Sequence, residues 1–272
     1  MTKSWSHLRL ASKIVAAALS LSALAPGMAA AASSKVPEPE HVVVVVLENH
    51  SFDEVLGTGE APFLDYLAKY GAKFTRSLGV AHPSQPNYFA LFSGSTHGVK
   101  DNRPHSFAAP TLAGSLRAKD KSFIGYVEPG SPRKHNPWES FADSQDVEQD
   151  ISSFPSDFAQ LPTVSFVIPN LDHDMHDGSI ADGDAWLRQH LSSYAEWSRS
   201  HNSLLIITFD ETEPEGSWIP TVFFGAAVRP GSYDEQINHY SILRTLEAMY
   251  GLPLLGDDTQ ATPIADVWAV HE

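Results

Sequence analysis

The 272-residue sequence contains no cysteine. This absence excludes disulfides, thiolate metal sites and a cysteine nucleophile, so the hydrophobic core alone must hold the fold together. Basic residues are also scarce, because 18 Lys and Arg stand against 33 Asp and Glu for a net charge of −15. Such a surface repels nucleic acids and anionic membranes. We therefore expect no nucleic-acid partner and no stable membrane insertion.

Long apolar runs are scarce as well. The main one lies near the N-terminus, where three basic residues precede an apolar stretch at 14–24 and small residues follow at 29–32. This stretch is too short for a stable membrane span, and the pattern is typical of a cleaved secretory signal peptide. We expect residues 1–32 to be that signal and residues 33–272 to be one exported domain, periplasmic or extracellular. The sequence does not indicate an oligomeric state.

Beyond the signal, short β-branched stretches alternate with amphipathic ones. A continuous apolar run such as that at 42–46 is typical of a strand buried on both faces of a sheet. Strands alternating with helices predict an α/β fold, a three-layer α/β/α sandwich around a mostly parallel sheet. We expect strands at 41–47, 73–80, 122–127, 163–168, 203–209 and 219–226, helices at 61–70, 86–94, 183–200 and 239–250, and mostly loops elsewhere in 101–160.

Polar residues follow two of the buried strands where those strands end. Glu48 and Asn49 follow the first strand, and Asp210 and Glu211 follow the strand at 203–209. In open α/β sheets the functional crevice lies outside the carboxyl ends of the strands. If the two strands are neighbours, their carboxylates would repel one another unless a divalent cation lies between them. Oxygen donors without cysteine favour Mg²⁺, Ca²⁺ or Mn²⁺ over Zn²⁺. The alternative is that each pair is simply a solvated strand end.

Ser84 stands just ahead of the predicted helix at 86–94. It could be an ordinary N-cap serine. The free N–H groups and positive dipole end of a helix also suit a phosphate or an alkoxide, and both roles can hold at once. Ser84 is not part of a G-x-S-x-G elbow, so an α/β-hydrolase lacks its main support. Ser51, in contrast, forms a capping box with Glu54 and is expected only to cap a helix.

A third polar group follows the predicted strand at 163–168. The segment at 170–178 holds two histidines and three aspartates: His173, His176, Asp172, Asp174 and Asp177. At a strand end these are candidate ligands, proton donors or phosphate contacts, although an exposed His/Asp loop is often inert. The remaining histidines, His135 and His239 among them, are scattered, and we expect them to be ordinary surface residues.

Four short motifs occur in a fixed order along the chain. They are ENHSFD at 48–53, HPSQPNY at 82–88, DMHD at 174–177 and FDE at 209–211. Together they resemble the phosphoesterase family of bacterial acid phosphatases and phospholipases C, within the alkaline phosphatase-like superfamily. The resemblance extends from about residue 40 to about residue 250, and it implies an alkaline phosphatase-like fold.

The resemblance also implies roles for individual residues. It makes Ser84 the nucleophile that forms a phosphoserine, and His176 or His173 the general acid. The implied substrate contacts are His82, Asn87 and Asp174. The implied ligands of one divalent metal ion are Glu48, Asn49, Asp210 and Glu211. Glu211 departs from the aspartate that is common in the family at this position, and zinc stays possible as the metal.

The function expected from this resemblance is that of an exported, metal-dependent phosphoric ester hydrolase. A phosphomonoesterase of the acid phosphatase type, acting on small phosphate esters, is the leading interpretation. The first alternative is a phosphodiesterase of the phospholipase C type. The second is a metal-independent serine esterase that uses Ser84 with a histidine and an aspartate, and the third is a non-catalytic binder of divalent cations or phosphate.

Overall fold

The computed structural model describes residues 1–2, 36–256 and 261–269. The expected signal peptide at 1–32 therefore falls almost entirely outside the described residues. Residues 34–272 form one compact unit. Among the described residues, no helix combines the length and the apolar character that a bilayer span requires.

The central sheet runs in the order β4-β3-β5-β1-β6-β7-β2-β8, and β9 also pairs with β2. Its strands are β1 (His41–Leu47), β2 (Ala72–Leu78), β3 (Phe123–Val127), β4 (Glu148–Asp150), β5 (Val164–Ile168), β6 (Ser203–Phe209), β7 (Ile219–Phe224), β8 (Gly231–Tyr233) and β9 (Ile237–Asn238). Only β7 runs antiparallel to its neighbours, β6 and β2, which confirms a mostly parallel sheet. The segment at 210–218 between β6 and β7 is too short for the crossover that a parallel connection needs.

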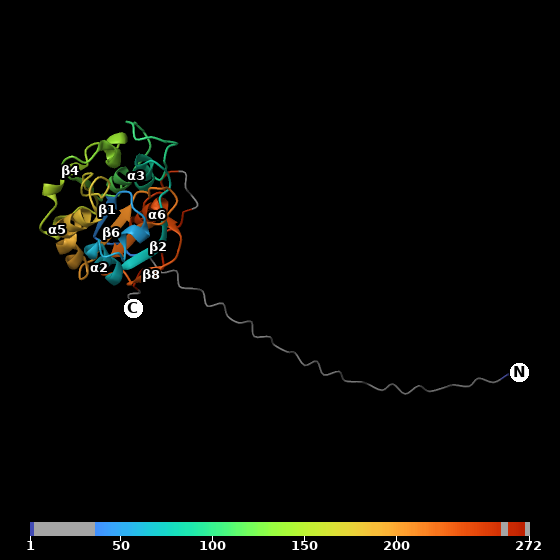
Figure 1. Cartoon of the computed structure of the whole chain (residues 1–272). Helices are drawn as coiled ribbons and strands as arrows, with labels where there is room; N and C mark the ends of the chain where they lie inside the picture. The colour runs from blue at the N-terminus through green and yellow to red at the C-terminus, as the bar shows by residue number, and fades with distance from the viewer. Residues whose placement is uncertain (3–35, 257–260, 270–272) are drawn as a thin grey trace. The chain divides into compact units, whose positions relative to one another are not determined.

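Helices cover both faces of this sheet, as predicted. They are α1 (Phe52–Val55), α2 (Pro62–Tyr70), α3 (Ser84–Ser93), α4 (Leu112–Arg117), α5 (Ile180–Ser198) and α6 (His239–Tyr250), with 3₁₀ turns η1 (Arg133–His135), η2 (Pro137–Ser140), η3 (Ile151–Ser153) and η4 (Phe158–Gln160). Helices α3, α4 and α6 pack on one face, and α2 and α5 pack on the other. In Figure 1, β1 and β6 lie between α5 and α6.

The valine run of β1 supplies both hydrophobic cores. Val42, Val44 and Val46 belong to the core beneath α3 and α6, whereas Val43 and Val45 belong to the core beneath α2 and α5. Because side chains alternate along a strand, only a strand apolar at every position can serve two cores. Burying each valine contributes roughly 1.5–3 kcal/mol, so β1 is a main anchor of the sheet.

Strand register places the polar residues that follow β1 and β6 next to each other. Leu47 of β1 pairs with Phe209 of β6, and the backbone N–H of Asp210 donates to the carbonyl of Leu47 at 2.9 Å. Strand β5 pairs with the other side of β1 in parallel. The segments that follow β1, β5 and β6 therefore all leave the sheet at the same edge, where the sequence predicts the site.

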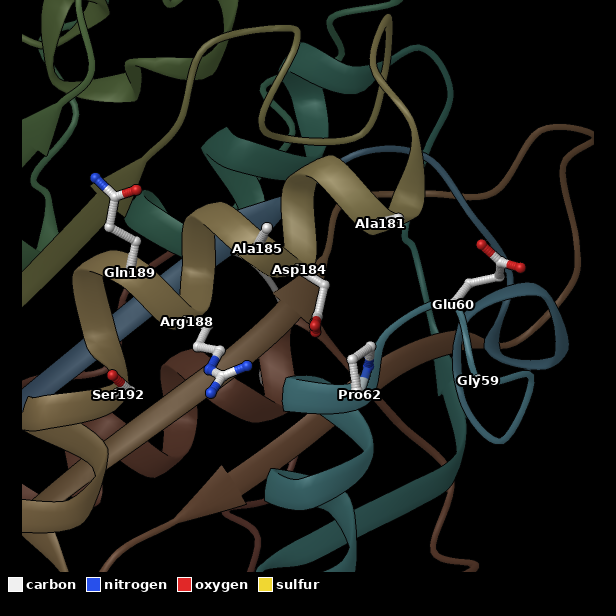
Figure 2. Close-up of a pocket in the computed structure, with 9 residues that line it drawn as sticks. All are labelled: Gly59, Glu60, Pro62, Ala181, Asp184, Ala185, Arg188, Gln189 and Ser192. Atoms are coloured by element: carbon white, nitrogen blue, oxygen red, sulfur yellow. The ribbon is translucent and has the colours of Figure 1, made fainter.

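Helix α5 caps helix α2 through one buried carboxylate. Asp184 accepts hydrogen bonds from the backbone N–H groups of Phe63 (2.9 Å) and Leu64 (2.8 Å), and it points toward Pro62 at the start of α2 (Figure 2). Ala61, the residue at the N-cap position of α2, has no side-chain acceptor. A residue distant in sequence thus supplies the cap that the local sequence lacks.

We expect Asp184→Ala to lower the free energy of unfolding by about 2 kcal/mol, because it removes a cap and leaves two buried N–H groups unpaired. Urea denaturation monitored by circular dichroism measures this change. Gln189→Ala, at an exposed position of the same helix, is the control and should stay within about 0.5 kcal/mol of the wild type. Equal losses in the two variants would contradict the capping role.

Candidate active site

Glu48 lies at the centre of a buried polar cluster at this edge of the sheet. Its side chain is fully buried directly after β1. The hydroxyl of Tyr88 donates to Oε1 at 2.7 Å, and the hydroxyl of Ser84 lies 3.0 Å from Oε2. Both partners come from α3, so this helix and the end of β1 are joined through one carboxylate.

Ser84 is the first residue of α3, and its hydroxyl is surrounded by charge. Besides Glu48, it faces Glu211 Oε1 at 3.3 Å, and the Lys134 ammonium donates to Oγ at 3.3 Å. A hydroxyl has one proton, so that proton points to one of the two carboxylates while a lone pair faces the ammonium. The carboxylates can accept the hydroxyl proton, and the Lys134 ammonium stabilises negative charge on the oxygen, as a nucleophile requires.

His135 is a site residue that the sequence reading missed. The prediction that it is an ordinary surface histidine was wrong, because its side chain is fully buried. Its Nε2 lies 2.9 Å from Glu48 Oε1 and its Nδ1 lies 3.3 Å from Asp174 Oδ2, although neither approach has the alignment of a hydrogen bond. The ring also stacks on Tyr88 with 4.9 Å between centroids. The one available signal was three consecutive basic residues, 133–135, in an acidic chain.

Glu48 and His135 form a charged pair. Burial alone would raise the pKa of Glu48, but His135, the Lys134 charge and the Tyr88 hydroxyl outweigh it and lower that pKa to about 2. Burial likewise opposes charge on His135, yet the carboxylates of Glu48 and Asp174 raise the pKa of this imidazole above its usual value. The lowered pKa of Glu48 and the raised pKa of His135 both favour the ionised form, because opposite charges at this distance stabilise each other.

Asp210 and Glu211 carry negative charge that the cluster does not balance. Burial, followed by the charges of Glu48 and Glu211, raises the pKa of Asp210 well above its ordinary value. Burial also raises the pKa of Glu211, although His82 Nδ1 lies 2.5 Å from Glu211 Oε2 and opposes the shift. Asp210 Oδ2 is buried without a hydrogen-bond partner among the described residues. Such an orphaned carboxylate oxygen is destabilising in the absence of a cation.

This donor set fits a hard divalent cation by chemistry and by burial. Glu48, Asp210 and Glu211 offer buried carboxylate oxygens, and oxygen ligation suits Mg²⁺, Ca²⁺ or Mn²⁺. Asn49 is only partly buried, and its amide nitrogen donates to Glu213 Oε2 at 3.2 Å. Within the ranges that the structure describes, no three His, Cys, Asp or Glu side chains already form a ready-made metal site. The predicted ligand set stays a proposal.

The segment at 170–178 is fixed to the same cluster. The backbone carbonyl of Asp174 accepts from the N–H of Glu48 at 2.8 Å. The next residue, Met175, has φ of 80°, in the left-handed region that bulky residues rarely adopt. Its buried side chain packs so closely on Gly183 that a Cβ there would meet Met175 Cγ at 2.4 Å. Such a conformation persists only where the surroundings impose it, which is common at functional sites.

The two histidines of this segment lie outside the buried cluster. His173 Nδ1 lies 2.8 Å from Glu128 Oε1, and its side chain is 36% exposed. His176 Nδ1 lies 2.7 Å from Asp177 Oδ1, and its side chain is 35% exposed. Both rings use Nδ1 for a carboxylate, but Glu128 also accepts from the backbone N–H of Asn170 and the indole of Trp186, whereas Asp177 is the chain neighbour of His176. We keep His176 as the first candidate for the general acid and His173 as the second.

Asn87, a predicted substrate contact, has its amide already engaged. Its Oδ1 accepts from the backbone N–H groups of Val80 (2.9 Å) and Ala81 (3.0 Å), and its Nδ2 donates to the Ala81 carbonyl at 2.8 Å. These bonds make Asn87 a support for the loop that leads to Ser84. His82, in the same loop, is 41% exposed beside Glu211 and is placed to meet a substrate.

His239 is a second histidine whose predicted surface position was wrong. It begins α6, its side chain is buried, and its Nε2 donates to the carbonyl of Asp210 at 2.6 Å. Burial lowers its pKa to about 4, so the ring is neutral at ordinary pH. His239 therefore fixes the backbone of Asp210 without adding charge to the cluster.

A surface hollow of about 610 Å³ lies elsewhere. It is lined by α5 and the segment that leads into α2 (Figure 2). Its buried titratable residue, Asp184, already accepts two backbone hydrogen bonds. Figure 2 shows Arg188 on the same helix, one turn away. This hollow holds no nucleophile paired with a base, so we place the active site at Ser84.

Comparisons with known proteins identify the family of this chain. The model of the phosphoesterase family matches residues 58–253. The chain is 46% identical over 255 residues to the phosphatidylinositol-3-phosphatase of Mycobacterium tuberculosis, covering 87% of this chain and 85% of that protein. It is 30% identical over 248 residues to an acid phosphatase of Aspergillus fumigatus, covering 78% of this chain and 55% of that protein. The chain thus spans about half the length of the fungal relative.

Solved structures share the fold. A protein of the alkaline phosphatase superfamily from Vibrio parahaemolyticus superposes with a TM-score of 0.59 at 13% identity, over 86% of this chain and 72% of that one. Murine ectonucleotide pyrophosphatase/phosphodiesterase 5 superposes with a TM-score of 0.56 at 13% identity, over 80% of this chain and 96% of that one. These likenesses confirm the alkaline phosphatase-like fold. With the family model matched across most of the chain and a relative at 46% identity, the chain belongs to the phosphoesterase family, a family of phosphate ester hydrolases.

Proposed function

We propose that this protein is an exported, metal-dependent phosphomonoesterase of the acid phosphatase type, with Ser84 as its nucleophile. The observation that carries the proposal is the position of the Ser84 hydroxyl at the start of α3, between two buried carboxylates and the Lys134 ammonium. The start of a helix also suits a phosphoryl group, because free N–H groups and the positive dipole end are found there. The acid phosphatase names of relatives support the monoester class.

The residues present account for a two-step reaction. Ser84 Oγ attacks phosphorus, the bond from phosphorus to the leaving oxygen breaks, and a phosphoserine forms. The hydroxyl proton passes to Glu48 or Glu211, since both carboxylates lie within reach of that hydroxyl. The leaving oxygen takes a proton from a histidine, for which His176 is our candidate. Water gives a proton to the same histidine and attacks phosphorus, and the bond from phosphorus to Ser84 Oγ breaks. The carboxyl returns its proton to the Ser84 oxygen as phosphate leaves.

Other residues hold and charge this site. Lys134 stabilises negative charge on the serine oxygen, and His135 keeps Glu48 ionised from the opposite side. A divalent cation held by Glu48, Asp210 and Glu211, with Asn49 beside them, would supply positive charge for the serine and phosphoryl oxygens. Export is inferred from the signal-like pattern at residues 1–32.

Two alternative functions have less support. A metal-independent serine esterase needs a histidine bonded to the serine, but the hydroxyl of Ser84 bonds carboxylates and a lysine, and His135 meets Glu48 and Asp174. A phosphodiesterase of the phospholipase C type would act on the same phosphorus chemistry. The name of the Mycobacterium tuberculosis relative, a phosphatidylinositol-3-phosphatase, denotes removal of a phosphate monoester and so favours the monoesterase.

A substrate panel tests the proposal. We expect turnover of p-nitrophenyl phosphate, and at least about 100-fold lower kcat/KM for bis-p-nitrophenyl phosphate and for the phosphodiester bond of phosphatidylcholine, because a monoester presents more negative charge to a cation-bearing site. Release of p-nitrophenol and of choline phosphate is measured on one enzyme preparation. Preferential cleavage of the diesters would reject the monoesterase in favour of the phospholipase C type.

A further inference from the structure

Arg133 is a cation that pairs with no carboxylate of the described residues, and it lies one residue from Lys134 beside the proposed nucleophile. It is half-buried in η1, immediately before Lys134, whose ammonium lies 3.3 Å from Ser84 Oγ. All acceptors that Arg133 meets are neutral: Gln85 Oε1 at 2.6 Å, the Asn102 carbonyl at 3.2 Å and the Ser140 hydroxyl at 3.4 Å. In a protein with 33 acidic residues, an unpaired guanidinium at this place needs a reason.

The position of this guanidinium is fixed by Gln85, the residue that follows Ser84. Gln85 is fully buried, and its amide nitrogen donates to the carbonyls of Asp101 (3.2 Å) and Arg103 (2.8 Å). These two bonds fix the plane of the amide group, and its Oε1 accepts a hydrogen bond from Arg133. The guanidinium is therefore held against the first turn of α3, and a rigid cation loses little entropy when it binds an anion.

Glu139 is the carboxylate whose pKa Arg133 affects, but it does not neutralise Arg133. Its side chain is mostly exposed, partial burial raises its pKa, and the charge of Arg133 is the smallest of the influences on that pKa. No carboxylate lies within ion-pair distance of Arg133 in the described part of the chain. Both N–H groups of Nη2 and one of Nη1 are engaged, so the Nε–H and one N–H of Nη1 remain for a ligand. Hydrogen bonds from a guanidinium to phosphate oxygens are charge-assisted and therefore strong.

The geometry points to Arg133 as the binding residue for a second anionic group of the substrate. This inference rests on the proposed function, because it takes Ser84 as the point where the first phosphate reacts. Lys134 then serves the reacting phosphate, and Arg133, its neighbour on the same turn, serves the other. The substrate class is a phosphate monoester that carries a second phosphate, either as a free monoester or as the phosphodiester of a lipid head group.

Arg133→Gln tests this assignment through a ratio of two activities. For each enzyme, kcat/KM is measured on fructose 1,6-bisphosphate and on soluble short-chain phosphatidylinositol 3-phosphate, and is divided by kcat/KM on p-nitrophenyl phosphate, which has one anionic group. We expect the ratio to fall about tenfold or more in Arg133→Gln, mainly through KM, because a charge-assisted pair is lost. Arg133→Lys keeps the positive charge but not the planar guanidinium with its fixed donors, and we expect it to recover part of the ratio.

Arg103→Gln is the matched control. The backbone carbonyl of Arg103 also accepts from Gln85, but its side chain is 83% exposed and already pairs with Asp101 Oδ2 at 2.8 Å. We expect its ratio to stay within about twofold of the wild type, as for an exposed surface pair. A thermal melt of each variant identifies any loss of folding, and Arg133→Lys supplies the test if Arg133→Gln does not fold.

The outcomes separate this inference from the function on which it rests. Failure of the wild type to hydrolyse p-nitrophenyl phosphate would reject the proposed function itself. Turnover of p-nitrophenyl phosphate with an unchanged ratio in Arg133→Gln, or with an equal drop on all substrates, would overturn the role of Arg133 alone. A fall with both two-phosphate substrates supports recognition of any second phosphate, and a fall confined to the lipid supports recognition of its phosphodiester.

Discussion

Replacing Ser84 by alanine is expected to lower kcat on p-nitrophenyl phosphate by about 10³-fold or more, because the group that forms the covalent intermediate is removed. The protein should stay folded, since the change deletes one oxygen from a buried site whose other partners are charged. Wild-type enzyme quenched in acid during turnover should carry one phosphoryl group on the peptide that contains Ser84. The same peptide from Ser84→Ala should carry none. Steady-state kinetics and peptide mass spectrometry measure the two effects.

Ser93→Ala controls for the structural effect of this substitution. Ser93 is also buried in α3, and its hydroxyl donates to the Phe89 carbonyl at 2.8 Å, away from the charged cluster. It should keep kcat within a few-fold of the wild type, because its hydroxyl contacts only α3 and the segment that follows it, Ser95 and His97. Phosphate on another residue, or comparable losses in the two variants, would rule out Ser84 as the nucleophile.

Removal of divalent cations is expected to reduce kcat/KM by about 100-fold or more, with recovery on adding Mg²⁺, Mn²⁺ or Ca²⁺. The reason lies in the excess negative charge of Glu48, Asp210 and Glu211 around the serine hydroxyl. Asp210→Asn should lose the same activity and should not recover it at the cation concentration that restores the wild type. Metal content by mass spectrometry after dialysis gives a readout independent of turnover.

Asp210→Asn, which should lower activity, should not lower the stability of the metal-free protein. The folded-state pKa of Asp210 is raised by burial and by the neighbouring carboxylates. A carboxyl with a raised folded pKa stabilises the fold at low pH and loses that contribution as pH rises through the folded value. In metal-free protein near neutral pH, Asp210→Asn should therefore melt at or above the wild type. Saturating cation, at about 100 times its dissociation constant, should stabilise the wild type by about 2.7 kcal/mol and the variant far less.

Asp150→Asn is the control for this pair of effects. Asp150 also ends a strand of the same sheet, but it is exposed at the end of β4. Its loss removes the same charge without touching the cluster, so metal content and kcat should match the wild type. If chelated wild-type enzyme kept full activity, or if Asp210→Asn bound the cation normally, the metal hypothesis would fail.

The sequence could predict the part of the site that follows from the sheet. Glu48 and Asp210 were placed together because each follows an uninterrupted apolar strand, and parallel neighbours end at the same edge. Ser84 was placed by its position at the start of a helix. Each inference needed only the local pattern and the rule for strand ends. The structure also brings Ser84 within hydrogen-bond distance of Glu48 and Glu211, a convergence that the family resemblance implied and the local pattern did not.

Residues in irregular segments could not be placed in this way. Lys134 and His135 lie in a 3₁₀ turn within 101–160, where no hydrophobic period indicates which side chains face inward. The burial of His135 depends on partners from three other segments, Glu48, Asp174 and Tyr88. Likewise, no local pattern shows that the amide of Asn87 is used by its own loop. Such roles follow from tertiary contacts, which a single sequence does not encode in readable form.

The in-register pairing of β1 and β6 makes the length of β1 a functional quantity. Deleting one valine would shift Glu48 by about 3.3 Å relative to Asp210 and would exchange the side chains that fill the two cores. Residues 101–160, by contrast, consist outside α4, β3 and β4 mostly of loops and turns whose length no ladder fixes. The chain thus has strands whose length fixes the position of the buried carboxylates, and loops in 101–160 that can gain or lose residues. Changes in substrate preference are therefore expected to accumulate in that segment, which includes Arg133.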